Sequence, residues 1–214
     1  MTATEPIADF FDRECCAAVD AGASVVPGAA GVTAVLLGGL DEVGVQGMRV
    51  LELGAGAGAL SRELVGRGAA SVAGLDLSPI SVEHATKAAA SAGLSERLSY
   101  SVGDGAEVPL EAYDVVVSQK VFCCYPQPDR LLDNTLPAAG RVYALVLPES
   151  RGPVGVFSRA IVATENALQW LRRERFRAYA HDVHAIERRL ATAGFERQFA
   201  RRHWAWLVLV FARR

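Results

Sequence analysis

Short apolar runs alternate with longer amphipathic segments along most of this 214-residue chain. Five of the runs have the length and composition of buried strands, at residues 49–53, 71–75, 98–102, 113–117 and 140–147. Between them, apolar positions recur with helical spacing at residues 57–67, 79–92 and 127–136. Strands that alternate with helices in this way predict an α/β fold built on a parallel sheet.

The beginning of the chain departs from this alternation. Two helices are predicted before the first strand, at residues 5–22 and within residues 29–46. Because they precede the sheet, we expect residues 1–46 to form an N-terminal helical cap or lid. Residues 47–214 then form the main domain.

The end of the chain departs from it as well. Helices are predicted at residues 154–174, with a wide basic face, and at residues 181–193. Two final apolar runs, at 195–201 and 204–211, predict a hairpin with a tight turn near Arg202 and His203. The hairpin adds two antiparallel strands, so the complete prediction is a Rossmann-like sheet of seven strands with an antiparallel C-terminal hairpin.

The most informative stretch lies at the end of the first strand. Residues 49–60 read Arg-Val-Leu-Glu-Leu-Gly-Ala-Gly-Ala-Gly-Ala-Leu, which predicts a strand, a tight turn and the start of a helix. The glycines at 54, 56 and 58 carry no Cβ, so the backbone can lie against a ligand while the N–H groups of the helix face it. This arrangement indicates a seat for a cofactor that contains adenosine.

Two cofactor families fit these glycines. Gly54, Gly56 and Ala59 also satisfy the dinucleotide fingerprint G-x-G-x-x-G/A. Asp76 ends the second strand, 22 positions after Gly54, where a carboxylate can accept hydrogen bonds from both ribose hydroxyls. Both families use an acid at this place, so Asp76 indicates a ribose and leaves the choice open.

The third strand favours one family, because it ends in Gly103-Asp104-Gly105-Ala106. With this acid and the terminal hairpin, residues 45–148 resemble the class I S-adenosylmethionine (SAM) methyltransferases. The resemblance implies SAM as the cofactor. It also implies that Glu52 lies near the methionine amino group, that Leu77 packs on adenine and that Asp104 contacts the adenine amine. Further cofactor contacts are implied for Ala55, Gly105, Ala106, Ser118 and Gln119.

Three further segments resemble the Mg-protoporphyrin O-methyltransferase-like branch of bacterial small-molecule methyltransferases: residues 118–126, 175–181 and 193–195. In that branch the acceptor lies over the residues that follow the fourth strand, under a lid of N-terminal helices. Glu52 and Ala55 replace the more usual Asp and Cys of the branch. We therefore infer no tetrapyrrole substrate, and expect a small-molecule acceptor of specialised metabolism.

The predicted reaction is O-methylation of a carboxylate or a phenol. A carboxylate needs no base, whereas a phenol benefits from one, so His181 is the candidate base and Tyr125 the candidate hydrogen-bond partner of the acceptor. N- or C-methylation stays open, as does a SAM-binding protein that catalyses a non-methylating rearrangement or cyclisation. An NAD-dependent oxidoreductase is less favoured, because Asp104 and the terminal hairpin do not fit it. No metal is expected, since the sequence has no His-x₃₋₅-His, Cys-x₂-Cys or acidic cluster.

Charge is divided unevenly along the chain. Residues 151–214 carry 13 Arg against 5 acids, a net charge of +8. This charge could indicate nucleic-acid binding, but we interpret these arginines as solvated helix faces.

Four cysteines in two vicinal pairs are interpreted as reduced thiols of a cytoplasmic protein. No secretory signal or spanning helix is expected. The predicted partners are a small-molecule acceptor, with no nucleic acid and no membrane, in a monomer or homodimer.

Overall fold

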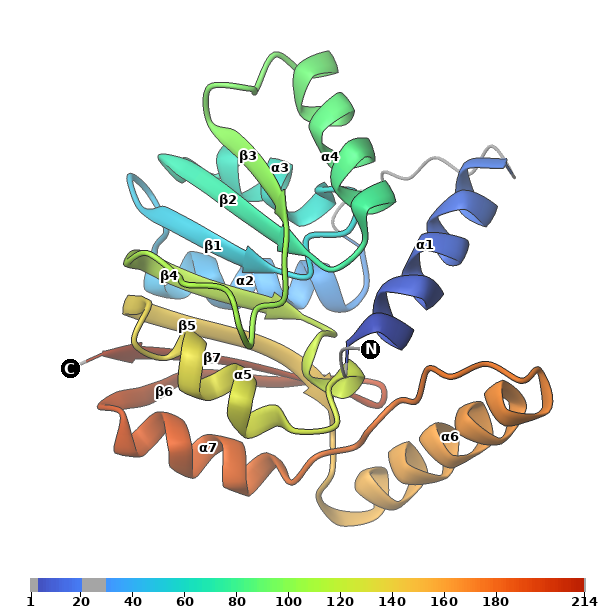
Figure 1. The fold of residues 1–214 in the computed structure, drawn as a ribbon. Helices are drawn as coiled ribbons and strands as arrows, with labels where there is room; N and C mark the ends of the chain where they lie inside the picture. The colour runs from blue at the N-terminus through green and yellow to red at the C-terminus, as the bar shows by residue number, and fades with distance from the viewer. Residues whose placement is uncertain (1–3, 21–29, 214) are drawn as a thin grey trace.

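A computed structural model describes residues 4–20 and 30–213 and contains the predicted sheet (Figure 1). Its seven strands run in the order β3-β2-β1-β4-β5-β7-β6. The strands are β1 (Arg49–Leu53), β2 (Ser71–Asp76), β3 (Leu98–Val102), β4 (Tyr113–Gln119), β5 (Ala139–Pro148), β6 (Phe195–His203) and β7 (Trp206–Arg213). The helices are α1 (Glu5–Asp20), α2 (Val32–Val43), α3 (Ala59–Gly66), α4 (Pro79–Ser91), the 3₁₀ turn η1 (Phe122–Cys124), α5 (Pro128–Thr135), α6 (Gly152–Leu171) and α7 (Val183–Thr192).

The predicted seven-stranded fold with its terminal hairpin is confirmed. Strands β1 to β5 pair in parallel, and β7 runs antiparallel to both β5 and β6. The turn of the hairpin lies two residues later than predicted, because His203 pairs with Trp206 and leaves Trp204 and Ala205 as the turn. Residues 21, 22 and 29 of the predicted N-terminal helices lie outside the described residues.

Helices cover both faces of the sheet and bury two apolar cores. On one face, α2 and α3 contribute leucines and valines to one core and α4 contributes Ala89, and on the other face α5 and α7 contribute to the second. The alternation of side chains along β1 supplies both, since Leu51 and Leu53 enter one core and Val50 the other. The strand sequences are apolar at nearly every position because both faces are covered.

The helix α2 belongs to this packing and not to a cap. Leu36, Leu37 and Leu40 are fully buried, and α2 lies against β5, β6 and β7. A Cβ at Gly39 would stand 2.7 Å from the Phe199 ring, so this glycine permits the close approach of helix and sheet. The predicted lid therefore consists of α1 alone among the described residues, because the apolar stripe of α2 is used by the sheet.

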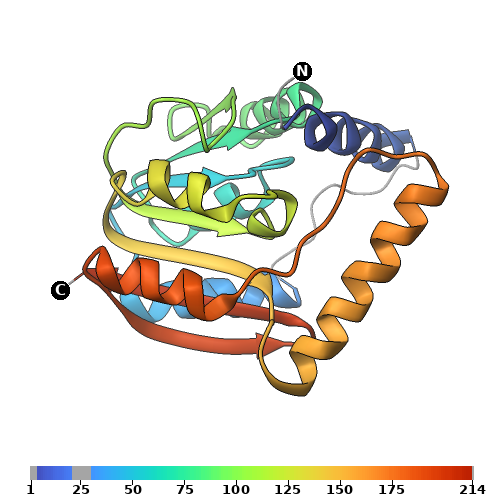
Figure 2. The ribbon, with the colours of Figure 1, turned by 60° about the horizontal axis from the view of Figure 1, so that its bottom comes forward.

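Two helices do not cover the sheet. Both α1 and α6 stand beyond the carboxyl ends of the parallel strands, and the chain that follows α6 passes close to α1 (Figure 2). The predicted basic face of the 154–174 helix is absent from α6. The helix ends at Leu171, before most of the arginines, and its exposed side is apolar.

One acidic side chain of β1 is buried under the helices that cover the sheet. Glu52 is 2% exposed and accepts a hydrogen bond from the Ser61 hydroxyl on α3. Burial is the largest cause that raises the pKa of Glu52 to about 8, and the nearby negative charge of Asp76 adds to it. The side chain is therefore largely protonated at neutral pH.

We expect the free energy of unfolding to fall as pH rises from about 4.5, the ordinary pKa of Glu52, to its folded value of about 8. In this window the folded chain keeps a proton that the unfolded chain has released. A difference of one in pKa corresponds to about 1.4 kcal/mol, so the contribution is on the order of 5 kcal/mol. Urea unfolding of the wild type and of Glu52→Gln at several pH values measures it. The variant should lack this decline, and parallel profiles would contradict the assignment.

Candidate cofactor and acceptor site

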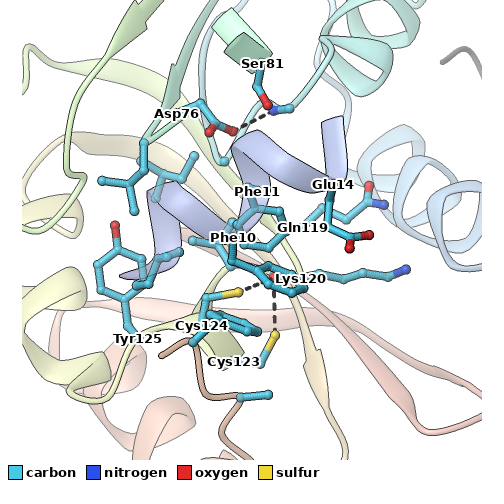
Figure 3. Close-up of a pocket in the computed structure, with 18 of the residues that line it drawn as sticks. Phe10, Phe11, Glu14, Asp76, Ser81, Gln119, Lys120, Cys123, Cys124 and Tyr125 are labelled. Atoms are coloured by element: carbon cyan, nitrogen blue, oxygen red, sulfur yellow. Dashed lines mark hydrogen bonds between the residues drawn. The ribbon is translucent and has the colours of Figure 1, made fainter. Parts of the chain in front are cut away.

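A pocket of about 650 Å³ opens at the carboxyl edge of the sheet (Figure 3). Its floor comes from the ends of β1, β2 and β4, its walls come from η1 and α6, and its roof comes from α1. Carboxyl edges of parallel strands are where open α/β sheets bind ligands, at the point where the strand order reverses. Here the reversal falls between β1 and β4, and the pocket lies directly beside it.

The glycine-rich turn forms one end of the pocket. Gly54, Gly56 and Gly58 all have left-handed backbone conformations, with φ of 66°, 51° and 72°. A Cβ at Gly54 would stand 2.3 Å from the Val121 side chain, and one at Gly58 would stand 2.4 Å from the Tyr100 hydroxyl. A Cβ at Gly56 would meet nothing within 4 Å, and this residue lines the pocket. The turn is thus packed from behind and open toward a ligand.

Asp76 stands beside this turn, at the end of β2. One carboxylate oxygen accepts from the backbone N–H of Gly56 at 2.7 Å and the other from that of Ser78 at 2.9 Å. Burial raises the pKa of Asp76, while these backbone hydrogen bonds act in the opposite direction. Each carboxylate oxygen has a further lone pair, so this carboxylate can still accept from ligand hydroxyls. Leu77 follows it and also lines the pocket.

Asp104 and Tyr125 form a hydrogen-bonded pair next to the pocket. One oxygen of Asp104 accepts from the backbone N–H of Ala106 at 2.8 Å and from the Tyr125 hydroxyl at 2.9 Å. Burial, followed by the charge of Asp104, raises the pKa of Tyr125, so its hydroxyl keeps its proton and donates. Tyr125 and Gly105 line the pocket. This places Tyr125 at the end with Asp104, away from the predicted contact with the acceptor.

Two polar atoms near the end of β4 are buried without a hydrogen-bond partner among the described residues. Gln119 donates from Nε2 to the Thr33 hydroxyl at 2.9 Å, but its Oε1 has no partner. The Ser118 hydroxyl is also buried without a hydrogen-bond partner among these residues. Of the two, only Gln119 lines the pocket. A buried acceptor without a partner is costly unless a ligand supplies the donor. An ammonium group such as that of SAM would be such a donor, so the polar residues fit the predicted cofactor.

The predicted cofactor residues divide into two groups. Those that line the pocket are Gly54, Gly56, Asp76, Leu77, Gly105 and Gln119. Those that support it from behind are Glu52, Ala55, Gly58, Asp104, Ala106 and Ser118. Glu52 points to the opposite face of β1, toward Ser61, so a direct contact with the methionine end of a cofactor is not part of this geometry.

The geometry of His181 argues against its predicted role as a base. Its Nε2 lies 3.0 Å from the carbonyl oxygen of Phe122 and 2.9 Å from that of Tyr125, so this nitrogen must carry a proton and donate. The ring stacks on Tyr179 and does not line the pocket. Burial lowers the pKa of His181. The neutral ring links the loop before α7 to the turn η1. A second hydrogen bond links the same two segments, from the backbone N–H of Tyr179 to the carbonyl oxygen of Cys123 at 2.7 Å.

At the other end of the pocket, sequence reasoning predicted a lid of N-terminal helices but missed the outer wall from α6. The roof of this end is formed by Ile7, Phe10, Phe11 and Glu14 of α1, and the sticks in Figure 3 show the two phenylalanines lying over Cys123 and Cys124, with Tyr125 to one side. Its outer wall comes from α6 and the residue after it, through Glu165, Asn166, Leu168, Gln169 and Arg172. The spacing of Glu165, Gln169 and Arg172 places them on one helical stripe, and this was the signal that could have revealed the wall.

The roof helix α1 is held at several points along its length. Phe10 stacks on Phe176 with ring centroids 4.4 Å apart, and Arg13 forms an ion pair with Glu174. The Ser78 hydroxyl donates to Asp12, directly beside the cofactor end. The lid therefore bridges the chain after α6 and the turn after β2, which closes the pocket from above.

Two findings bear on metals and membranes. Among residues 4–20 and 30–213, no group of three or more His, Cys, Asp or Glu side chains could hold a metal ion. Within the same described ranges, no helix is both long enough and apolar enough to cross a membrane.

A family model described as a methyltransferase domain matches residues 50–142. The probable chloroplastic tocopherol O-methyltransferase of Oryza sativa subsp. japonica is 34% identical over 82 residues, which span 37% of this chain and only 23% of that protein. The magnesium protoporphyrin IX methyltransferase of Synechocystis PCC 6803, solved with S-adenosylhomocysteine, covers 97% of this chain and 98% of its own at 20% identity, with a TM-score of 0.71. The [4+2]-cyclase SpnF covers 97% of this chain and 95% of its own at 17% identity, with a TM-score of 0.67.

At such low sequence identities the solved structures show only that the folds are alike. The family model adds a sequence match to a methyltransferase domain. The strand order and terminal hairpin agree with both findings. Residues 50–142 therefore match a methyltransferase-domain model, and the chain has the fold of the class I SAM-dependent methyltransferases and resembles their magnesium-protoporphyrin branch.

Proposed function

We propose that this chain binds SAM and methylates an oxygen atom of a small, largely apolar acceptor, with a carboxylate favoured over a phenol. The observation that carries the proposal is that one pocket joins two unlike ends. Asp76 and Gly56 lie at one end, the aromatic roof of α1 lies at the other, and Gln119 lies beside Lys120 near that roof. A cofactor and an acceptor bound there would lie against each other.

The polar residues divide the work of holding the cofactor. In the proposed mode, Asp76 accepts from the ribose hydroxyls, Asp104 stands near the adenine amine, and Gln119 Oε1 accepts from the methionine ammonium group. The cofactor supplies an electrophilic methyl group on its sulfonium sulfur. The chain contributes alignment and exclusion of water, and such positioning can account for about 7–11 kcal/mol of a barrier.

The absence of a histidine from the pocket favours a carboxylate acceptor. All four histidines lie in the described part of the chain, and none of them lines the pocket. A carboxylate is ionised at neutral pH and needs no base, whereas a phenol with a pKa near 10 does. Lys120 lines the acceptor end, where its ammonium group lies 4.9 Å from the centroid of the Trp206 ring and can attract an anion.

The backbone at Lys120 supports a functional placement of this side chain. Lys120 has φ of 61°, a left-handed conformation that costs energy in a residue other than glycine. The thiols of Cys123 and Cys124 both donate to its carbonyl oxygen, which holds the strained turn in place (Figure 3). The two cysteines thus act as small packing groups. The reduced thiols of Cys123 and Cys124 also support the proposed cytoplasmic location.

A second candidate function is a SAM-dependent cyclisation without methyl transfer. The likeness in fold to the [4+2]-cyclase SpnF favours it over N- or C-methylation, for which no observation speaks. The apolar roof and outer wall would suit either reaction. The two candidates differ in one product, since only methyl transfer releases S-adenosylhomocysteine.

Asp76→Ala should weaken SAM binding by about 10- to 100-fold, because two charge-assisted hydrogen bonds to ribose are lost. Calorimetric titration measures the affinity. Asp114→Ala is the matched control, since Asp114 also accepts a backbone N–H, from Arg49 at 2.9 Å, but lies outside the pocket. Equal affinities in the two variants would contradict the ribose assignment.

Tyr125→Phe distinguishes the two possible roles of the Tyr125 hydroxyl, which are to position Asp104 or to contact the acceptor. If it positions the Asp104 carboxylate, the loss of one hydrogen bond should raise the KM for SAM roughly 3- to 10-fold and leave kcat at saturating SAM nearly unchanged. If it instead served the acceptor, kcat or the acceptor KM would change while the KM for SAM would not. Steady-state kinetics with each substrate varied in turn distinguishes these results.

The reaction itself is tested with a panel of acceptors. Aromatic and terpenoid carboxylates, each paired with a matched phenol or alcohol, are incubated with SAM, and S-adenosylhomocysteine is quantified. We expect turnover with carboxylates. Lys120→Met should raise the KM for the carboxylate about tenfold without changing SAM affinity, since one charged contact is lost. SAM binding without S-adenosylhomocysteine from any acceptor would overturn the methyl transfer and favour cyclisation.

A further inference from the structure

The outward side of α6 is an apolar surface that the methyltransferase site does not use. Val156, Phe157, Trp170 and Leu171 are 61%, 59%, 69% and 68% exposed. Ala160, Ala163, Thr164 and Ala167 lie between them in the sequence and are exposed as well. We call these eight residues the outer face of α6. Their spacing of three and four residues places them on one side of the helix.

No charged side chain interrupts this outer face. The helix carries two ionisable residues, Arg159 and Glu165. Glu165 lines the pocket together with Asn166 and Gln169, and Arg159 donates to the carbonyl oxygen of Ser150 at 2.8 Å. The polar side of α6 therefore faces its own protein, and the apolar side faces away from it. This is the reverse of the usual arrangement for a helix on a protein surface.

Positive charge borders the outer face. Arg173 and Arg175 lie just beyond the end of the helix and are exposed, whereas Arg172 lines the pocket. Near the start of the helix, the Ser158 hydroxyl donates to Ala205 in the turn between β6 and β7 at 3.4 Å. That turn presents Trp204, which is 82% exposed, after the exposed Arg201 and Arg202. Basic and aromatic side chains beside an apolar helix face are the combination that binds the interface of an anionic membrane.

We propose that the chain docks on an anionic lipid surface through the outer face of α6, with the helix lying in the plane of the interface. The cavity opens along the polar side of the same helix, so a docked protein would hold its acceptor pocket at the membrane. The inference goes beyond the proposed methyl transfer, since neither the exposure of α6 nor its charge pattern depends on the reaction.

The size of the outer face favours a lipid surface over a second copy of the chain. A helix of 20 residues is about 30 Å long, and a stripe about 10 Å wide presents roughly 300 Å². Two such faces would bury roughly 600 Å² in total, below the approximately 1,000 Å² of a stable protein interface. An interfacial helix has no such requirement, because lipid surrounds its whole apolar side.

Vesicle flotation of the full chain tests the proposal. The wild type should float with vesicles of phosphatidylcholine and phosphatidylglycerol, float less with phosphatidylcholine alone, and be released as salt is raised. The double variant Phe157→Ser, Trp170→Ser should partition about tenfold less or weaker still. Val102→Ser is the matched control, since Val102 is 52% exposed at the end of β3 on the opposite half of the sheet, and it should float like the wild type.

A second measurement locates the contact. Trp170→Phe keeps an apolar ring, so it should still float, but quenching of tryptophan fluorescence by brominated lipid should fall compared with the wild type. Absence of flotation, or equal loss in the Val102 control, would overturn the proposal. So would light scattering that shows a dimer which the double variant converts to a monomer, because α6 would then serve a second copy. The vesicles contain neither SAM nor acceptor, so these results do not depend on the proposed reaction.

Discussion

The reversal of strand order between β1 and β4 is the constraint on which the rest of this structure depends. Right-handed crossovers place α3 and α4 on one face of the sheet and α5 and α7 on the other. The chain therefore leaves β1 and β4 in opposite directions, and a crevice remains above their carboxyl ends. The glycine turn after β1 and the strained turn after β4 meet in this crevice. Their contact is Val121 against Gly54, so tight that a Cβ there would collide.

This contact joins the two halves of the site mechanically. The turn after β1 faces the cofactor end, and Lys120 precedes Val121 at the acceptor end. A shift of either turn would move the other, because a packed contact of this kind has little free volume. The thiols of Cys123 and Cys124 and the ring of His181 hold the second turn and η1 through backbone carbonyl oxygens. Residues that look chemically active in the sequence thus serve to fix the backbone of the pocket.

The parts of the site that were predictable from sequence are those specified by local structure. Gly54, Gly56, Asp76 and Asp104 each lie at the end of a strand, so their approach follows once the strands are recognised and paired. The roles of Tyr125, His181 and α2 depend on contacts between distant segments. His181 bonds to residues 56 and 59 positions away, and Tyr125 to one 21 positions away. No spacing rule reports such contacts. The arginine-rich stretch also masked the apolar face of α6, because composition does not show where a helix ends.

Buried acids explain why the lid and the cofactor end are coupled. The negative charge of Asp76 helps to keep Glu52 protonated, and Asp12 of α1 adds a second negative charge that repels that of Asp76. Without a cation nearby, this arrangement is costly, and burial raises the pKa of both Glu52 and Asp76 as a result. A ligand that carries positive charge would relieve the repulsion and so stabilise the folded chain and the docked position of α1 together. The same charges would favour a cationic cofactor over an anionic dinucleotide, whose pyrophosphate would meet only further repulsion. The buried charges and the glycine turn therefore favour the same kind of cofactor, although they act through different residues.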